Sequence, residues 1–600
     1  MVRGTLELFA RNWDTALLFE LAYKLLLLFV IVPVEYGLAT LAMRVRGMTY
    51  VADVNLARFL GFPTTWLFAA VMVLLLAMYV LYEMCALILL NNACRSGRQV
   101  TLTQLVRLSI PQVVRMPRRG NLLIVVFVLL IVPLTNIGLV SSAVQRIHVP
   151  EFIDSYIDDT PWLLVVSTVA FVALLVVAFR WLFSLHYFTL YGMTFKQARR
   201  SSLELIRGNV LYVLVRLVAW WLAVGAAQAL LSLAYSGLIN VMAGLPGKGT
   251  VGAALLMGLF FVLTSAVNAL ALCLGAALTY AWLSQLFYRL VARRGAQEAP
   301  RTVVPAAPHQ KVMRHRRLIA TSLIVVSVLT FAAVALATGT GMLNQVSWTQ
   351  GCSVTAHRGG SWGAPENTLE AFDKAIDEGA DWVELDVRQT KDGVLVVSHD
   401  SNTRRTTGVD RVIWDSTYDE LKDLDNGSLF SPEYSSARIC TLDQALTACK
   451  GRVRMNIELK PDGHTSDLER KAVDLIRAHD MADQVCVASV SYDCLGRVKA
   501  YDPGITTIYD MTVAFGNIAE LKDADILSVD EAFVSPLLVD EAHEHGKQVF
   551  AWTVNEPDNM LRMYCYGVDS IVTDDVETAL SVTSLQVGVA LLHGMFEVAQ

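Results

Sequence analysis

The chain has few charged residues for its length. Of its 600 residues, 17% are Asp, Glu, Lys or Arg and 54% are hydrophobic, whereas soluble proteins carry about 25% charged residues. This shortage of charge excludes a disordered chain and a wholly soluble one. The length is far above the roughly 150 residues typical of one domain, so at least two units are expected.

Each half of the chain is poor in charge of one sign. Residues 1–350 contain 12 Asp/Glu and 28 Lys/Arg, whereas residues 351–600 contain 43 and 21. A basic, apolar first half and an acidic, mixed second half are typical of a membrane domain followed by a soluble domain. No basic domain remains to bind nucleic acid, and the acidic half would repel phosphate backbones, so we expect no nucleic-acid partner.

Two common catalytic signatures are missing. There is no C-x-x-C pair of the kind used for zinc or redox chemistry, and no G-x-S-x-G nucleophile elbow. Six of the nine cysteines lie after residue 350. Disulfides and free buried thiols are both compatible with their spacing.

Long apolar stretches fill the first half. A helix crosses a bilayer with about 20 apolar residues, and seven stretches reach that length, at 17–43, 65–91, 120–143, 161–187, 209–235, 253–288 and 318–340. The expected layout is a six-span helical membrane domain at 1–290, a Pro-rich cytoplasmic linker at 291–317, a seventh transmembrane helix at 318–340 that serves as a tether, a catalytic domain at 350–580, and a C-terminal tail or final helix at 581–600.

The basic residues also predict the orientation. With a cytoplasmic N-terminus, the inner loops hold 20 Lys/Arg and the outer loops hold five. Because basic residues favour the cytoplasmic side, we expect a multi-pass protein of the cell membrane with its C-terminal domain outside the cytoplasm.

The second half alternates strand-like and helical runs, which predicts a parallel (β/α)₈ TIM barrel. Helices are expected at 367–379, 441–450, 466–480, 491–502 and 535–546. Barrel strands are expected at 353–357, 381–387, 394–398, 453–459, 485–489, 526–529, 548–554 and 570–573. A short run at 505–509 is left without a place in this count.

Reactive side chains gather where these strands end, at the rim where TIM barrels place their active sites. Glu384 and Asp386 are two apart and so share one face of a strand. With Glu458 they form a group of three carboxylates that requires a cation, and hard oxygen ligands favour Mg²⁺ or Ca²⁺. We therefore interpret these three residues as metal ligands.

The other strand ends carry groups suited to phosphodiester cleavage. His357 and His399 are candidate general acid and base, and Arg358 and Lys460 are candidate phosphate ligands. Glycosidases need two carboxylates and no metal, which disfavours glycoside chemistry. His543 and His545 lie on a helix near the opposite rim, and we expect structural roles for them.

Eight motifs in this order resemble the glycerophosphodiester phosphodiesterase family. They are H-R-G (357–359), P-E-N-T (365–368), E-L-D (384–386), H-D (399–400), R-T-T-G (405–408), I-E-L-K (457–460), W-T-V-N (552–555) and G-V-D-S-I-V-T-D (567–574). The first half is similar to the multi-span domain attached to some bacterial members.

The resemblance implies a metal-dependent TIM-barrel hydrolase that releases glycerol 3-phosphate and an alcohol. It assigns the divalent cation to Glu384, Asp386 and Glu458, proton transfer to His357 and His399, and phosphate binding to Arg358 and Lys460. Trp552 would line the pocket, although packing at the barrel rim suits it equally well.

Several alternatives stay open at this point. The substrate could be a glycerophosphodiester, a lysophospholipid or a polyglycerolphosphate, and either water or a glycerol hydroxyl could attack phosphorus. A competing hypothesis is a membrane receptor or transporter whose barrel binds such ligands without turnover. The paired acid/base groups argue against it, because a binding protein does not need them. The sequence predicts no oligomeric state.

Overall fold

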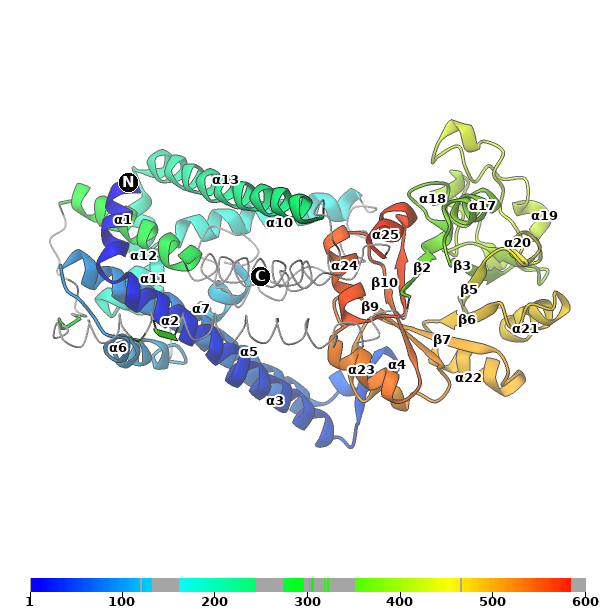
Figure 1. Ribbon diagram of the computed structural model, residues 1–600, viewed down its shortest axis with the longest axis horizontal. Helices are drawn as coiled ribbons and strands as arrows, with labels where there is room; N and C mark the ends of the chain where they lie inside the picture. Colours follow the sequence, from blue (N-terminus) through cyan, green and yellow to red (C-terminus); the bar gives the residue numbers. More distant parts are fainter. Residues whose placement is uncertain are drawn as a thin grey trace. The chain divides into compact units, whose positions relative to one another are not determined.

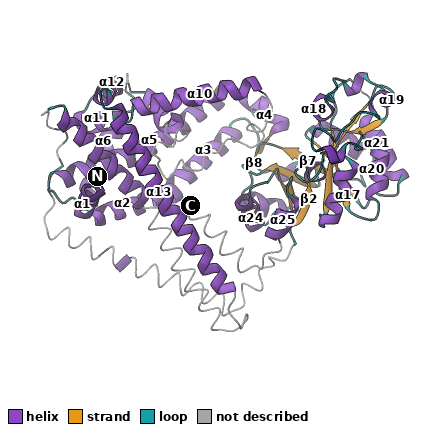
Figure 2. Cartoon of the chain, turned by 90° about the horizontal axis from the view of Figure 1, so that it is seen from above, coloured by secondary structure: helices purple, strands orange, loops and turns teal. Residues whose placement is uncertain are grey.

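The computed structural model describes residues 2–118, 121–131, 161–243, 274–295, 300, 302, 304–306, 318, 321–322, 351–464 and 467–583. These residues form two compact units, which are described separately (Figure 1). One unit is helical and belongs to the first half of the chain. The other is the barrel of the second half, together with Thr40–Thr65. Figure 2 shows the strands gathered in the barrel unit.

The helical unit is built from long apolar helices. Its elements are α1 (Val2–Arg11), α2 (Trp13–Leu26), η1 (Leu27–Ile31), α3 (Val32–Arg44), α5 (Pro63–Arg95), α6 (Leu102–Val114), α7 (Leu123–Val126), η2 (Phe127–Ile131), α10 (Pro161–Arg180), α11 (Ser184–Tyr191), α12 (Phe195–Ile206) and α13 (Val210–Ala243). Helix α10 is apolar all round and leaves Val165 and Val169 exposed, as expected where lipid is the solvent.

Four stretches of the described residues are long and apolar enough to cross a membrane. They are Trp13–Arg44, Pro63–Arg95, Trp162–Tyr191 and Val210–Leu230. These correspond to four of the seven expected spans. The expected spans at 120–143, 253–288 and 318–340 lie partly or largely outside the described residues.

Eight parallel strands close the barrel. They are β2 (Ser353–Ala356), β3 (Trp382–Gln389), β5 (Arg454–Leu459), β6 (Val485–Ser489), β7 (Thr506–Met511), β9 (Ile526–Asp530), β10 (Gln548–Trp552) and β11 (Ser570–Thr573). Each pairs in parallel with its neighbour, and β2 pairs with both β11 and β3, so these strands leave no open edge. The predicted TIM barrel is confirmed.

One predicted barrel strand is wrong. The run at 394–398 forms β4 (Leu395–Val397), which pairs antiparallel with β3 and stands outside the barrel. The reason is the tight turn before it, where Thr390 and Val394 are hydrogen-bonded across Lys391–Gly393. So short a connection makes an antiparallel hairpin, since a parallel pair needs a crossover of a dozen residues or more. The unplaced run at 505–509 supplies the missing barrel strand, β7.

Helices cover the outside of the barrel. They are α17 (Leu369–Glu378), α20 (Leu442–Cys449), α21 (Leu468–Ala478), α22 (Tyr492–Tyr501), α23 (Pro536–Glu544), α24 (Pro557–Tyr566) and α25 (Val576–Thr583). The five predicted helices are among them. Short elements lie between β4 and α20, namely α18 (Arg404–Thr407), η4 (Ile413–Asp415), α19 (Tyr418–Leu421) and η5 (Pro432–Tyr434).

Successive side chains of each barrel strand point alternately outward to the helices and inward to the interior of the barrel. The outward side chains of the barrel strands form one large buried cluster with the helices. The inward ones form a smaller cluster that includes Trp382, Ile508 and Phe550. Glu384 and Asp386 follow farther along the same inward row of β3, so the polar groups lie next to this inner apolar cluster. All six cysteines after residue 350 are free thiols.

The buried outward row should carry much of the stability of the barrel. Leu527 on β9 is fully buried, whereas Leu537 on α23 is 60% exposed. We expect Leu527→Ala to lower the free energy of unfolding by about 2–5 kcal/mol, because it leaves a cavity. Leu537→Ala should change it by less than about 0.5 kcal/mol. Urea unfolding of the purified protein, followed by tryptophan fluorescence, measures both. Equal effects would contradict this core.

Candidate active site

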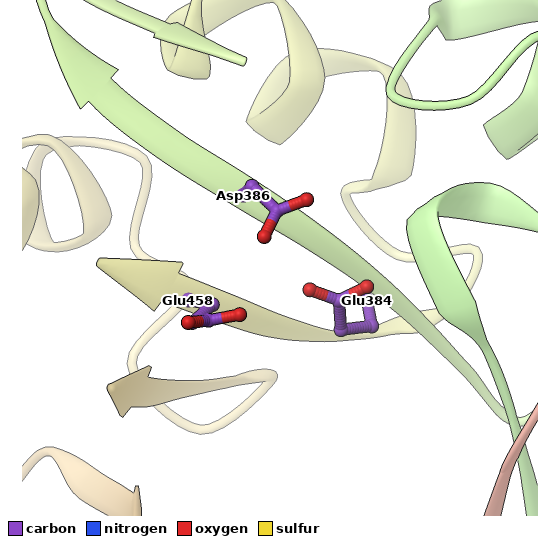
Figure 3. Close-up of side chains that lie close together, drawn as sticks. All are labelled: Glu384, Asp386 and Glu458. Carbon is purple, nitrogen blue, oxygen red and sulfur yellow. The ribbon is translucent and has the colours of Figure 1, made fainter. Parts of the chain in front are cut away.

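Three carboxylates meet at the carboxyl ends of two neighbouring strands (Figure 3). Glu384 and Asp386 lie on β3, and Glu458 lies on β5 directly opposite Asp386 in the parallel register. One oxygen of each lies within 4.8 Å of the others. The spacing of two along β3 puts both of its carboxylates on the inner face, as the sequence predicts.

Two cations lie against this group. Lys460 Nζ is 3.0 Å from Asp386 Oδ1 and 2.8 Å from Glu458 Oε1. Arg358 donates its backbone N–H to Glu384 Oε2 at 2.7 Å, and its Nε lies 3.7 Å from Asp386 Oδ2. Burial would raise the pKa of Asp386, but Lys460, His399 and Arg358 hold it well below its usual range.

Glu384 is less well compensated. Burial, and then the charge of Asp386, raise the pKa of Glu384 to about 8. A divalent cation among the three carboxylates would favour the ionised form of Glu384. The oxygen-only donor set and the convergence of the three groups therefore fit a hard cation such as Mg²⁺ or Ca²⁺.

His357 is oriented by a buried carboxylate. It follows β2, and its Nδ1 donates to Asp574 Oδ1 at 2.7 Å. Asn555 and Ser361 donate to the same carboxylate. Burial opposes protonation of His357, but the charge of Asp574 outweighs it and raises the pKa of the imidazole. With Nδ1 engaged, Nε2 is the ring nitrogen left for substrate.

His399 reaches the site by a different route from the one predicted. Because the hairpin folds back, Ser398 donates its N–H to the carbonyl of Asp386, and the carbonyl of His399 accepts from Arg388 of β3. His399 thus stands beside Asp386 although β4 is no barrel strand. Its Nδ1 donates to Asp400 Oδ1 at 2.8 Å.

A chain of ion pairs joins the two histidine regions. Arg405 bonds Asp400 through Nε and Glu366 through Nη1 and Nη2, and Glu366 in turn accepts from Arg358. These contacts hold Arg358, the residue that the sequence predicts as a phosphate ligand, in a fixed position. Arg358 Nε is buried and has no hydrogen-bond partner among the described residues. It is therefore a donor available to a ligand.

Asn367 is more central than its motif indicates. Its amide nitrogen donates to Asp386 Oδ2 at 2.8 Å, and its oxygen accepts the Asp386 N–H at 3.1 Å. It adopts a left-handed backbone, with φ of +57°, which asparagine tolerates better than most residues. Asn367 therefore positions Asp386.

Asp510 is a partly buried carboxylate that is absent from the predicted site residues. It lies near the carboxyl end of β7, and burial, followed by the charge of Glu458, raises its pKa to about 8. The available signal was the alternation in the run at 505–509. The expected strand stopped one residue short of Asp510.

The remaining predicted residues have clear positions. Trp552 ends β10 next to the inner apolar cluster, and its Nε1 is buried without a hydrogen-bond partner among the described residues. His543 bonds Asp569, and His545 bonds the backbone carbonyl of Glu541. Both histidines precede β10, at the rim opposite the carboxylates, so they form no metal site here.

Comparison with known proteins places both halves of the chain. Residues 357–578 match the family described as "Glycerophosphoryl diester phosphodiesterase family". Residues 2–334, more than half of the chain, match "Membrane domain of glycerophosphoryl diester phosphodiesterase".

Individual relatives cover the barrel. A glycerophosphodiester phosphodiesterase of Caldanaerobacter subterraneus is 36% identical over 233 residues, which are 38% of this chain and 96% of the relative. One of Bacillus altitudinis is 32% identical over 237 residues, with 38% and 97% covered.

Solved structures also align with the barrel. A phosphodiesterase of Oleispira antarctica, in complex with the product sn-glycerol-3-phosphate, shares 31% identity with a TM-score of 0.35 and covers 38% of this chain and 96% of its own. A glycerophosphodiester phosphodiesterase of Agrobacterium tumefaciens shares 27% identity with a TM-score of 0.35, covering 39% and 100%.

The family match over more than half of the chain agrees with the barrel and with the order of the motifs. The chain therefore belongs to the glycerophosphodiester phosphodiesterases, in the form that carries an N-terminal membrane domain.

Proposed function

We propose that the barrel hydrolyses glycerophosphodiesters to glycerol 3-phosphate and an alcohol by metal-assisted acid/base catalysis, on the outer side of the cell membrane. The observation that carries the proposal is the convergence of Glu384, Asp386 and Glu458 within 4.8 Å at the rim that also presents His357 and His399. Two histidines that are each oriented by a carboxylate favour turnover over mere binding.

Glu384, Asp386 and Glu458 would hold Mg²⁺ or Ca²⁺. When bound, the cation supplies a Lewis acid that neutralises the phosphate and stabilises charge in the transition state. Asn367 fixes the orientation of Asp386 through both ends of its amide. Lys460 lies between Asp386 and Glu458, where it can partner both a ligand carboxylate and a phosphate oxygen.

The two histidines would move the protons. Their Nδ1 atoms donate to Asp574 and Asp400, which leaves each Nε2 for substrate. One imidazole takes the proton of the attacking oxygen as its bond to phosphorus forms. The other gives a proton to the alcohol oxygen as the bond between that oxygen and phosphorus breaks.

The phosphate and the glycerol or leaving group of the substrate would contact two donors that have no hydrogen bond among the described residues. Arg358 Nε is buried, has no hydrogen bond among the described residues, and lies beside the carboxylates, which suits a phosphate oxygen. Trp552 offers an apolar face and an unpartnered Nε1 at the same rim. We propose that it lines the pocket against the glycerol or the leaving group.

A turnover assay on the full-length protein tests the proposal. Purified protein in detergent or lipid is given glycerophosphocholine, glycerophosphoglycerol, a lysophospholipid or a polyglycerolphosphate, with Mg²⁺, with Ca²⁺ or with chelator. We expect release of glycerol 3-phosphate, or of acylglycerol 3-phosphate from the lysophospholipid, that the chelator abolishes. Glu384→Ala and Glu458→Ala should each lower kcat/KM by at least about 10³-fold, because each removes a cation ligand.

The matched control is Glu544→Ala, an exposed glutamate at the end of α23. It should retain the activity of the wild type. Circular dichroism should show all three variants folded. Full activity of Glu384→Ala or Glu458→Ala would refute the ligand assignment, and activity in chelator would refute metal dependence.

The His357–Asp574 pair predicts a shift in pH dependence. The charge of Asp574 raises the pKa of His357, so the imidazole keeps its proton to a higher pH. Asp574→Asn removes that charge and lowers the pKa, so the limb of the kcat/KM profile that His357 controls should move to lower pH. The control is Asp443→Asn, which removes the carboxylate that bonds a different histidine, His479. It should leave the pH profile unchanged. An unmoved limb in Asp574→Asn would contradict the assigned pairing.

Labelling of intact cells tests the proposed orientation. Cysteine is introduced at Glu433, which is exposed on the barrel, or at Arg294, which is exposed on the predicted cytoplasmic side. A membrane-impermeant maleimide should label Glu433→Cys in intact cells and Arg294→Cys only after permeabilisation. The reverse pattern would place the barrel in the cytoplasm.

A further inference from the structure

The barrel lacks one helix of its outer layer. Residues 512–525, which connect β7 to β9, form only β8 (Ala514–Gly516), the short η6 (Ile518–Glu520) and turns. The outward side chains of β7 include Tyr509 and Met511, and both are fully buried. Something other than a following helix must therefore cover this side of β7.

The cover comes from the far end of the sequence. Strand β1 (Tyr50–Ala52) pairs antiparallel with β8, with Val51 opposite Phe515. It leads into α4 (Asp53–Leu60), whose Val54 N–H donates to the Tyr509 hydroxyl at 3.0 Å. Ala52 is fully buried in the same cluster as Tyr509 and Met511. Residues 49–60, here named the covering loop, thus take the place of the missing helix.

The barrel is shaped to receive this loop. Gly516 has a φ of +83°, and a Cβ built there would lie 2.6 Å from the Thr49 carbonyl oxygen. Only glycine allows so close an approach without a shift of the backbone. Thr49 adds two bonds, accepting the Asn517 N–H at 3.0 Å and donating to Glu520 at 2.7 Å. Both the covering loop and the barrel contribute to this close fit, as two segments do where they pack inside one domain.

The loop also reaches the rim of the active site. Asp53 accepts the N–H groups of Thr512 and Val513, at 2.7 and 3.0 Å. These two residues directly follow the carboxyl end of β7, whose partly buried Asp510 lies close to Glu458 and Lys460. A carboxylate that accepts two adjacent backbone N–H groups fixes the path of the chain there.

We infer that the covering loop is a structural part of the catalytic domain and that Asp53 is a positioning residue for the catalytic rim. Asp53 holds Thr512 and Val513 directly after the carboxyl end of β7, one of the strands that end at the catalytic rim. The inference on catalysis rests on the proposed function, whereas the docking of the loop does not.

The location of the loop in the sequence has a consequence for topology. It lies between the candidate spans Trp13–Arg44 and Pro63–Arg95. Strands on opposite sides of a bilayer cannot pair, so this loop and the barrel share one side. An even number of spans must then separate them, a condition that the seven-span layout meets.

Cross-linking in the full-length protein tests the docking directly. Residues directly opposite in an antiparallel pair have Cβ atoms about 4.5–5.5 Å apart, within reach of a disulfide after a small adjustment. The pair Val51→Cys and Phe515→Cys should link under mild oxidation. After cleavage at a protease site introduced into 291–317, the two fragments should stay joined until reduced.

The control pair is Val51→Cys with Trp362→Cys, an exposed site after β2 on the far side of the barrel. It should not link. Equal linking in both pairs, or none in the first, would overturn the docking.

Kinetics test the role of Asp53. With glycerophosphocholine, or whichever substrate the wild type turns over, Asp53→Ala should raise KM about tenfold while kcat changes less than about threefold. Asp53→Asn keeps an accepting oxygen and should restore most of the loss. Arg58→Ala, on an exposed position of α4, should match the wild type.

An unchanged KM in Asp53→Ala, or a fall in kcat alone, would overturn the positioning role. No turnover by the wild type would instead count against the proposed function and leave the cross-linking result standing.

Discussion

The charge balance around three carboxylates, two of them buried and one partly buried, organises the rim of this barrel. Two like charges 4 Å apart repel by about 4 kcal/mol at an effective dielectric constant near 20, so Glu384, Asp386 and Glu458 need positive partners. Lys460 lies against Asp386 and Glu458, and Arg358 lies against Glu384 and Asp386. Burial, and then the charge of Asp386, raise the pKa of Glu384 even with these two cations present. A divalent cation at the proposed metal site would favour the ionised form of Glu384.

A second set of carboxylates keeps the cationic groups in place. Asp574 and Asp400 each hold a histidine through Nδ1, and Glu366 joins Arg358 to Arg405. His357 and two neutral donors, Ser361 and Asn555, hold the pKa of Asp574 well below its usual range, although burial opposes this. The proposed acid/base groups and metal ligands can therefore lie close together, because cationic side chains are shared among the carboxylates.

The part of this site that the sequence predicts follows from one rule of topology. Parallel strands end at a common rim, so reactive residues at strand ends such as Asp386 and Glu458 must meet. The same reasoning placed the run at 394–398 in the barrel. That prediction was wrong, because the run forms the antiparallel strand β4 (Leu395–Val397). His399 still reaches the site, since the hairpin returns it to the level of Asp386. The residue type and the H-D motif therefore pointed to His399 even though the predicted strand order was wrong.

Other features had no readable signal. Asn367 positions Asp386 through a left-handed backbone that a single sequence does not reveal. The covering loop is a three-residue strand and a short helix, and its partner residues lie about 460 positions away. Hydrophobic periodicity predicts the structure of one segment at a time. The contact of the covering loop with the barrel depends instead on Gly516, which allows the close approach, and on Asp53, which accepts two N–H groups of the barrel.

The covering loop also changes where the catalytic domain begins. By sequence alone the domain is one continuous stretch after the last span, and a fragment starting there would contain every proposed ligand and proton carrier. It would lack the residues that bury Tyr509 and Met511 and that hold the backbone after Asp510. A TIM barrel with one helix missing has an apolar gap between its strands and solvent, which is costly to expose. The loop that closes this gap lies in the sequence between two candidate spans, so the barrel unit is assembled from two separate stretches of the chain. Its fold therefore depends on residues between those spans as well as on the stretch after residue 350.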